Sequence, residues 1–185
     1  MEIVERKCKS SEDDRSFNFY LMRSRDWCNI IPVIADGKVV MVKQFRIGID
    51  RHTLEVPGGV TDHSDSNCQA AALRELEEET GYAPLPGAKC IHLGWNYPNP
   101  AILNNRAHSY IVGPVQKITG QHLDPGEMIE TIEVPIDEIP QKIIQGEINH
   151  ALMLNAFFFL SLQNQKVEES LIQSLNQFTR LESST

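Results

Sequence analysis

The sequence lacks the features that would place it in a membrane or in an oxidising compartment. No run of about 18 apolar residues occurs, and the opening segment MEIVERKCKS carries charges where a signal peptide needs an apolar centre. Cysteines number only 4, with no CxxC pair and no histidine at zinc-ligand spacing, so neither a disulfide framework nor a structural zinc site is indicated. We therefore expect a soluble, cytoplasmic protein whose cysteines are reduced and mostly buried.

Basic residues are also few. The sequence has 17 Lys and Arg against 25 Asp and Glu, which gives a formal net charge of -8 and a pI near 5.2. An acidic surface repels duplex nucleic acid and anionic membranes, so neither is an expected partner. A small anionic substrate is compatible with this balance if metal ions and a few local arginines receive it.

The length of 185 residues, of which 41% are hydrophobic, predicts one core and a single domain over 1–185. Residues 1–15 are expected to form a loose polar arm that leads into a sheet, and residues 179–185 a frayed tail. Asp36-Gly37 lies between two β-rich runs and predicts a hairpin of antiparallel strands. Further strands are expected at 53–56, 90–97, 109–115 and 129–134, and helices at 137–145 and 149–162. The last of these helices is apolar nearly all round, which predicts that it is deeply packed.

One further helix is predicted between Ser66 and Gly81. Ser66 and Gln69 form a capping box, residues 70–80 contain neither Gly nor Pro, and Gly81 supplies a left-handed stop. The apolar stripe of this helix, which should face the core, consists of Ala72, Leu73 and Leu76.

The opposite face of this helix carries Glu75, Glu78 and Glu79 at i, i+3 and i+4. Like charges at this spacing repel, so a compensating cation is expected, and carboxylate oxygens suit Mg²⁺ or Mn²⁺. The turn at Gly58-Gly59 would let backbone carbonyls complete the coordination shell. A merely solvated acidic face is the alternative, but such a face would require neither the glycine turn nor Arg74.

Residues 58–82 resemble the Nudix box, whose pattern is Gly, five residues, Glu, seven residues, then Arg-Glu-apolar-x-Glu-Glu-x-Gly-apolar. The second half matches at each fixed position from Arg74 to Tyr82. In the first half Asp65 stands in place of Glu and eight residues precede Arg74, so the loop is one residue longer. The resemblance implies an α/β/α sandwich around a mixed sheet. It also implies that Glu75, Glu78, Glu79 and Gly59 bind the metal, with Arg74 orienting a carboxylate.

Outside the box, the segments 27–31, 42–46 and 54–59 are similar to the branch that hydrolyses ADP-ribose and nucleoside diphosphate sugars. Pro98 occupies the place of a proline that follows the box in that branch. The guanidinium groups of Arg46 and Arg51 are expected to bind phosphate, and an aromatic ring is expected to stack on the base, with Trp27, Trp95 and Tyr97 as candidates. The remaining candidates for substrate contacts are Glu55, Pro98 and Asn104, the last beside Asn105 and Arg106.

The general base of this branch tends to come from a loop after the box, which resembles residues 126–130. Glu127 is the first candidate, Glu130 the second, and Glu79 the base if the loop stays away. No histidine forms a recognisable triad with Ser or Cys, which argues against covalent catalysis. A homodimer formed through the N-terminal strands is also expected, by the habit of the branch.

The sequence therefore predicts a Mg²⁺-dependent hydrolase that cuts ADP-ribose or a sugar nucleotide into a nucleoside monophosphate and a sugar phosphate. Two alternatives stay open. One is a Nudix hydrolase of another nucleotide, such as a dinucleoside polyphosphate, CoA, a capped RNA end or a nucleoside triphosphate. The other is a sensor that binds ADP-ribose without cutting it, against which the presence of all three glutamates argues.

Overall fold

The computed structural model of the chain describes residues 1–163, so the tail predicted at 179–185 lies outside the described residues. A mixed sheet forms its centre, with the strand order β5-β4-β3-β8-β7 and with β6 beside β3 and β9 beside β4. Its strands are β3 (Trp27–Ile34), β4 (Lys38–Arg46), β5 (Arg51–Glu55), β6 (Gly58–Val60), β7 (Tyr82–Asn96), β8 (Ala107–Lys117) and β9 (Ile129–Pro135). β3 and β8 run parallel and the other pairs are antiparallel. The predicted hairpin at Asp36-Gly37 is confirmed by the antiparallel β3–β4 pair and by the positive φ of Gly37, 84°.

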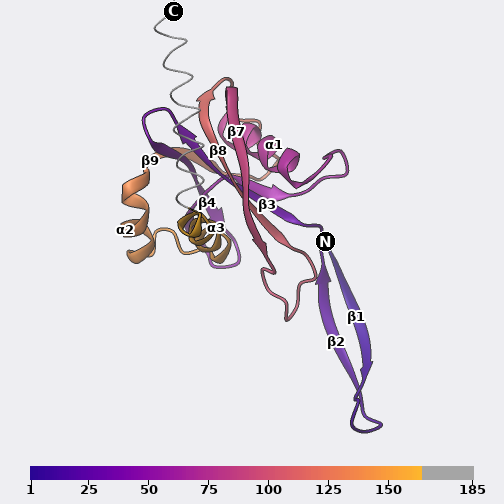
Figure 1. The fold of residues 1–185 in the computed structure, drawn as a ribbon. Coiled ribbons are helices and arrows are strands. Elements are labelled where there is room, and N and C mark those ends of the chain that lie inside the picture. The colour runs from indigo at the N-terminus through magenta and orange to yellow at the C-terminus, as the bar shows by residue number, and fades with distance from the viewer. Residues whose placement is uncertain (164–185) are drawn as a thin grey trace, which may run out of the picture.

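Helices cover the two faces of the sheet, as expected for an α/β/α sandwich (Figure 1). On one face α1 (Cys68–Thr80) packs over β3, β7 and β8 through a core that includes Ala71, Ala72 and Leu76. On the other face lie a 3-10 turn (Ile136–Glu138), α2 (Ile139–Ile144) and α3 (Ala151–Leu162), whose core includes Met153 and Phe157. Strand β3 is buried along nearly its whole length because both of its faces are covered.

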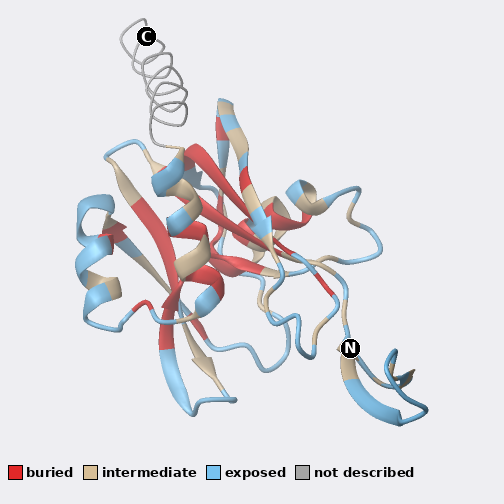
Figure 2. Ribbon diagram, turned by 60° about the horizontal axis from the view of Figure 1, so that its bottom comes forward, coloured by how far each residue is buried: buried red, intermediate tan, exposed pale blue. Residues whose placement is uncertain are grey.

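The N-terminal arm differs from the loose segment expected at 1–15. β1 (Glu2–Lys9) pairs with β2 (Ser16–Arg23) over its full length, from Glu2 opposite Arg23 to Lys9 opposite Ser16. Backbone pairing with the apolar strand that follows orders the polar residues, which the sequence pattern alone did not reveal. The hairpin projects from the body and is exposed over most of its surface (Figures 1 and 2).

Two helix predictions are corrected. The cap of α1 is Asn67 rather than Ser66, because the Asn67 Oδ1 accepts the Ala70 N–H at 2.9 Å. Helix α3 is not buried all round: Phe158 is 59% exposed and Leu162 is 66% exposed, since only the side that carries Met153 meets the sheet. No helix within residues 1–163 is long and apolar enough to cross a membrane.

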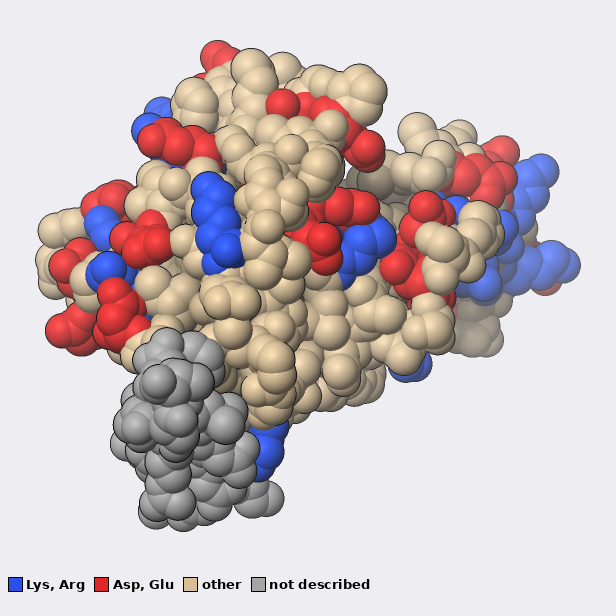
Figure 3. Space-filling model, turned by 90° about the horizontal axis from the view of Figure 1, so that it is seen from above, with Lys and Arg blue, Asp and Glu red and all other residues tan. Residues whose placement is uncertain are grey.

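Charges on the surface are mixed in sign. On the face drawn in Figure 3, Lys and Arg lie in small groups among Asp and Glu, without one continuous basic surface.

Candidate active site

Helix α1 holds its acidic side chains in place because both of its ends are fixed. Asn67 caps the start, and Gly81, with φ of 75°, donates its N–H to the Glu77 carbonyl at 2.8 Å and ends the helix. Leu76 is fully buried against the sheet. The side chains of Glu75 and Glu78 therefore point away from the core toward the loop that contains Gly58 and Gly59.

Arg74 clamps three carboxylates at the edge of this acidic face. Its Nη1 donates to Glu75 Oε1 at 3.0 Å and to Glu78 Oε2 at 2.7 Å, while Nε and Nη2 each reach an Asp65 oxygen at 3.1 Å. Planar guanidinium geometry favours the two-pronged pair with Asp65. The residue that replaces the first glutamate of the motif thus anchors the arginine, and the arginine in turn orients Glu75 and Glu78.

Glu79 is the most deeply buried acid of the group, with 4% of its surface exposed. The Gly58 N–H donates to its Oε2 at 3.0 Å, which joins the glycine turn to the helix. Burial raises the pKa of Glu79 well above its ordinary value, and the nearby carboxylates of Glu75 and Glu127 raise it further. Burial likewise raises the pKa of Glu75.

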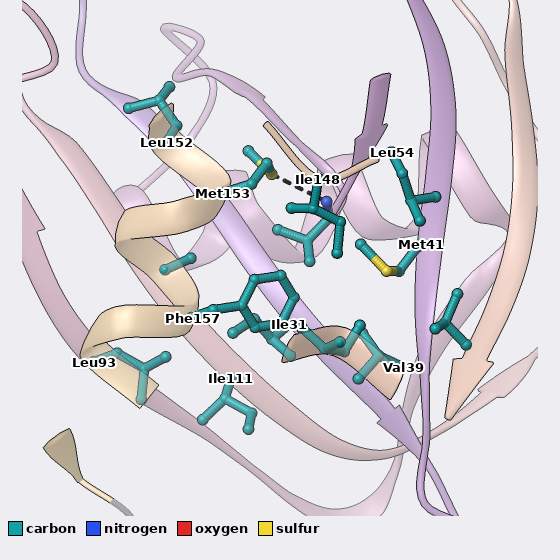
Figure 4. Close-up of a cluster of buried hydrophobic side chains, with 14 of the residues drawn as sticks. Ile31, Val39, Met41, Leu54, Leu93, Ile111, Ile148, Leu152, Met153 and Phe157 are labelled. Carbon is teal, nitrogen blue, oxygen red and sulfur yellow. Dashed lines mark hydrogen bonds between the residues drawn. The ribbon is translucent and has the colours of Figure 1, made fainter. Parts of the chain in front are cut away.

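The two glycines of the turn are required by close approaches of the chain. A Cβ on Gly59 would lie 2.6 Å from the carboxyl carbon of Glu75, and a Cβ on Gly58 would lie 2.8 Å from the Asn29 Cα in the central strand. The turn is also tied to α3, because the Val56 N–H donates to the Met153 sulfur at 3.1 Å (Figure 4). The turn at Gly59 therefore packs directly against the Glu75 side chain of the acidic face.

A cleft of about 310 Å³ opens over these groups. Eight of the residues predicted from the sequence line it: Trp27, Arg46, Gly59, Arg74, Glu75, Glu78, Glu79 and Glu127. They come from β3, β4, β6, α1 and the loop before β9, so the fold brings together residues that lie up to 100 positions apart in the sequence.

Arg46 lines the cleft and is held in place by Glu55. Its Nε and Nη2 donate to both oxygens of Glu55 at 2.7 and 2.6 Å, and Glu55 also meets His150 Nδ1 at 2.9 Å. Although burial alone would raise the pKa of Glu55, these hydrogen bonds lower it to about 2, so Glu55 is ionised. The Arg46 guanidinium carbon also lies 5.9 Å from the centre of the Trp27 ring, within cation–π range.

Five of the residues predicted to contact the substrate lie outside this cleft. Glu55 is buried behind it, and Arg51 is exposed on β5. Asn104 accepts the Ser24 N–H at 3.1 Å beneath the N-terminal hairpin, and Tyr97 is 48% exposed and packs edge-on against Trp95. The fifth is Pro98, which lies in the same loop as Asn104, between β7 and β8. Direct contacts of these residues with a substrate stay predictions.

The two candidate bases of the loop at 126–130 have different positions. Glu127 lines the cleft, and its Oε2 accepts the Asp124 N–H at 3.0 Å. Glu130 lies on β9, where its side chain is 69% exposed and faces Lys43 at 3.9 Å. The geometry therefore separates them, with Glu127 beside the acidic helix and Glu130 outside the cleft.

Sequence reasoning missed three polar residues that also line the cleft, namely Gln44, His122 and Asp124. His122 is held there because its N–H donates to the Glu78 carbonyl at 2.8 Å. His122 and Asp124 lie in an irregular segment after β8, where hydrophobic periodicity gives no signal. Gln44 could have been found from its place on β4, two residues before Arg46.

The donor set fits a hard divalent cation. Glu75, Glu78 and Glu79 supply carboxylate oxygens, and the Gly59 backbone lies directly against Glu75. Burial and neighbouring acids raise the pKa of two of the three carboxyl groups, Glu75 and Glu79, an electrostatic cost that a bound cation would offset. Sulfur and imidazole ligands are absent from this set, which favours Mg²⁺ or Mn²⁺ over a softer metal.

Comparison with known proteins points to one family. The NUDIX domain model matches residues 26–157. The chain is 29% identical to the ADP-ribose pyrophosphatase of Bacillus subtilis over 135 residues, which cover 72% of this chain and 71% of that protein. It is 45% identical to the ADP-sugar pyrophosphatase of Mus musculus over 125 residues, or 63% of this chain and 56% of that one. A crystal structure of an ADP compounds hydrolase has the same fold, with a TM-score of 0.75 and 16% identity over 89% of this chain and 86% of that one.

Proposed function

Because the chain belongs to the NUDIX family of hydrolases, we propose that it cuts the diphosphate of ADP-ribose or of a nucleoside diphosphate sugar. The products would be a nucleoside monophosphate and a sugar phosphate. The observation that carries the proposal is the gathering of Glu75, Glu78, Glu79 and Glu127 opposite Arg46 in one cleft. The names of the relatives, an ADP-ribose pyrophosphatase and an ADP-sugar pyrophosphatase, support the substrate class.

Nudix hydrolases generally use a divalent metal, and the proposal assigns Mg²⁺, with Mn²⁺ as a substitute, to Glu75, Glu78, Glu79 and the Gly59 carbonyl. Such an ion supplies charge neutralisation at the diphosphate oxygens and lowers the pKa of water. Arg74 holds Glu75 and Glu78 in the orientation that ligands require, at 3.0 and 2.7 Å. A misplaced ligand would weaken both metal binding and the chemistry.

Arg46 is the proposed partner of a phosphate oxygen. Its Nε and Nη2 are engaged by Glu55, so the remaining N–H groups of the guanidinium are the donors left for the substrate. Trp27 lies beside it and carries an indole N–H that is buried without a hydrogen-bond partner among residues 1–163. A substrate hydroxyl or phosphate oxygen would satisfy that donor.

Glu127 is the proposed general base. It lines the cleft beside the acidic helix, in the irregular segment between β8 and β9, and its Oε2 accepts the Asp124 N–H at 3.0 Å, which leaves Oε1 for an attacking water. Glu79 is less suited to this role because only 4% of its surface is exposed and it is a proposed metal ligand. The proton would pass from water to the Glu127 carboxylate as the P–O bond of the bridge breaks.

A homodimer formed through the N-terminal hairpin belongs to the same proposal. A two-stranded hairpin is marginal in water, and this one exposes Ile3 (74%), Phe19 (55%) and Tyr20 (64%). A second copy of the chain would cover these side chains. Light scattering that gave the mass of a monomer would remove this part of the proposal. A cytoplasmic location is also proposed, as expected for a protein without disulfides.

The decisive experiment is a substrate panel. The purified chain with Mg²⁺ is incubated with ADP-ribose, GDP-mannose, UDP-glucose, diadenosine polyphosphates and nucleoside triphosphates, and the products are identified by chromatography. Glu78→Gln serves as the inactive control, since it removes one ligand charge without changing the shape of the side chain. Turnover of ADP-ribose or a sugar nucleotide to a monophosphate supports the proposal. Turnover of triphosphates alone would contradict it.

A further inference from the structure

A second cluster of metal-binding side chains lies at the other end of α1, away from the acidic face. Asp26 immediately precedes β3, Cys68 is the first residue of α1, and His108 is near the start of β8. One ligand atom from each of the three lies within 4.8 Å of the other two. The spacing of the cysteines and histidines gave no sign of such a site, because its members come from three distant segments.

From this arrangement we infer that Asp26, Cys68 and His108 form a second metal site, separate from the hydrolase centre, that binds Zn²⁺ through carboxylate, thiolate and imidazole. Zinc bonds of 2.0 to 2.3 Å place neighbouring ligand atoms of a tetrahedral site roughly 3.3 to 3.8 Å apart. His108 Nε2 and Asp26 Oδ2 already lie 3.7 Å apart. Rotation of the Cys68 side chain would close the remaining gap of about an ångström.

Neighbouring groups hold the two outer ligands in orientation. His108 Nδ1 lies 3.3 Å from His92 Nε2, and the His92 ring hydrogen-bonds in turn to the Gly94 backbone. When Nδ1 donates its proton to His92, the Nε2 of His108 keeps the lone pair that a metal needs. The Asp26 Oδ1 accepts the Arg106 N–H at 2.7 Å, which leaves Oδ2 directed toward His108.

The Cys68 thiol has a second cysteine beside it. Cys28, fully buried in β3, is a close neighbour of Cys68. All three proposed ligands are partly exposed, with 38% of the Asp26 side chain and 16% of the His108 side chain accessible, so an ion can enter.

Sulfur and imidazole select a metal different from the one expected at the glutamates. Mg²⁺ prefers oxygen ligands, whereas thiolate and imidazole suit Zn²⁺ and Co²⁺. Three protein ligands leave one tetrahedral position for water. The bound ion would join β3, β8 and the start of α1, and so would fix the N-terminal end of the helix that carries the glutamates.

Co²⁺ is the probe that tests this site, because a thiolate ligand gives cobalt a charge-transfer band that carboxylates do not. The reduced, chelator-treated chain is titrated with Co²⁺ in excess Mg²⁺, which keeps the carboxylate centre filled. We expect the band to appear with one Co²⁺ per chain and to disappear when Zn²⁺ is added. Absence of the band in the unmodified chain would overturn the inference.

Variants identify the ligands without reference to hydrolysis. Cys68→Ser should abolish the band, whereas the matched control Cys90→Ser, a second partly buried cysteine of the same core cluster, should keep it. His92→Phe preserves the ring that packs 4.9 Å from Tyr110 but removes the nitrogen, so Co²⁺ should bind about 10- to 100-fold more weakly. A band unchanged in Cys68→Ser would exclude the site.

Two further variants guard against ambiguous results. If Cys68→Ser does not fold, Asp26→Asn tests the same site, because it keeps the acceptor for the Arg106 N–H and removes the ligand charge, so Co²⁺ should bind more weakly. Unchanged affinity in that variant would contradict the inference. Glu78→Gln should keep the band, so a failure of the hydrolase proposal leaves this test intact.

Discussion

The two adjacent glycines in the turn before α1 should give opposite results when each is replaced by alanine. Gly59→Ala should lose activity and keep its stability, whereas Gly58→Ala should lose stability. In Gly59→Ala the new Cβ would lie 2.6 Å from the carboxyl carbon of Glu75 and closer still to its Oε1, where ordinary contact begins at 3.4 Å, so the carboxyl group must retreat by about 1 Å. The end of a glutamate side chain can make that movement without disturbing the backbone. The fold should therefore survive while the proposed metal ligand is displaced.

The size of the loss follows from this displacement. A misplacement of about 1 Å in a catalytic group costs roughly 100-fold in rate, so kcat/KM of Gly59→Ala should fall by about that factor. The free energy of unfolding should change by less than about 1 kcal/mol, since the clash is with a mobile group. A Mg²⁺ titration should show a higher midpoint than that of the unmodified protein.

Gly58→Ala should behave in the reverse manner. Its Cβ would lie 2.8 Å from both the Cα and the Cβ of Asn29, in the fully buried central strand, which cannot retreat cheaply. Overpacking of this kind costs about 1 to 3 kcal/mol, measurable by urea denaturation. Gly120→Ala, with no atom within 4 Å of the new Cβ, is the neutral control. The reasoning is refuted if Gly59→Ala keeps full activity with an unchanged Mg²⁺ midpoint.

Three further predictions test the remaining parts of the site. Glu127→Gln should lower kcat by about 10²- to 10⁴-fold with little change in KM, because it removes the proposed base. The control Glu130→Gln, outside the cleft, should be nearly as active as the unmodified chain. Equal losses of activity in the two variants would exclude this assignment of the base. Arg74→Lys keeps the charge but loses the two-pronged pair with Asp65, so the Mg²⁺ concentration that gives half-maximal activity should rise about tenfold or more. An unchanged Mg²⁺ midpoint would contradict the orienting role of Arg74. Burial would raise the pKa of Glu55, but hydrogen bonds from Arg46 and His150 outweigh it and lower the pKa from 4.5 to about 2. Ionised Glu55 should therefore contribute about 3 kcal/mol to the free energy of unfolding above pH 4.5, and this contribution should be lost as the pH falls toward 2. Glu55→Gln should abolish that pH dependence in urea denaturation.

The parts of the fold that could be predicted are those with local signals. The end of α1 at Gly81, the Asp36-Gly37 hairpin and the shared face of the three glutamates each depend on residues within a few positions of one another. Asn67 replaced Ser66 as the cap because both residue types can accept the N–H bond, and only the path of the loop decides between them.

Contacts between distant segments could not be predicted in the same way. The pairing of Asp65 with Arg74 depends on how the lengthened loop folds back, and His122 reaches the cleft through a backbone bond to Glu78. The approach of Cys68 to His108 depends on the placement of α1 over the parallel pair β3–β8. Such contacts follow from topology, which a pattern of residue types does not specify.

The guanidinium of Arg74 also bears on what happens when the divalent ion is withdrawn. Many small metalloproteins lose their folded shape on chelation because only the ion neutralises the groups that bind it. Here a resident cation already pairs with Asp65, Glu75 and Glu78. Chelation should therefore stop turnover without unfolding the chain, which should stay resistant to proteases. Activity should return when the ion is added back.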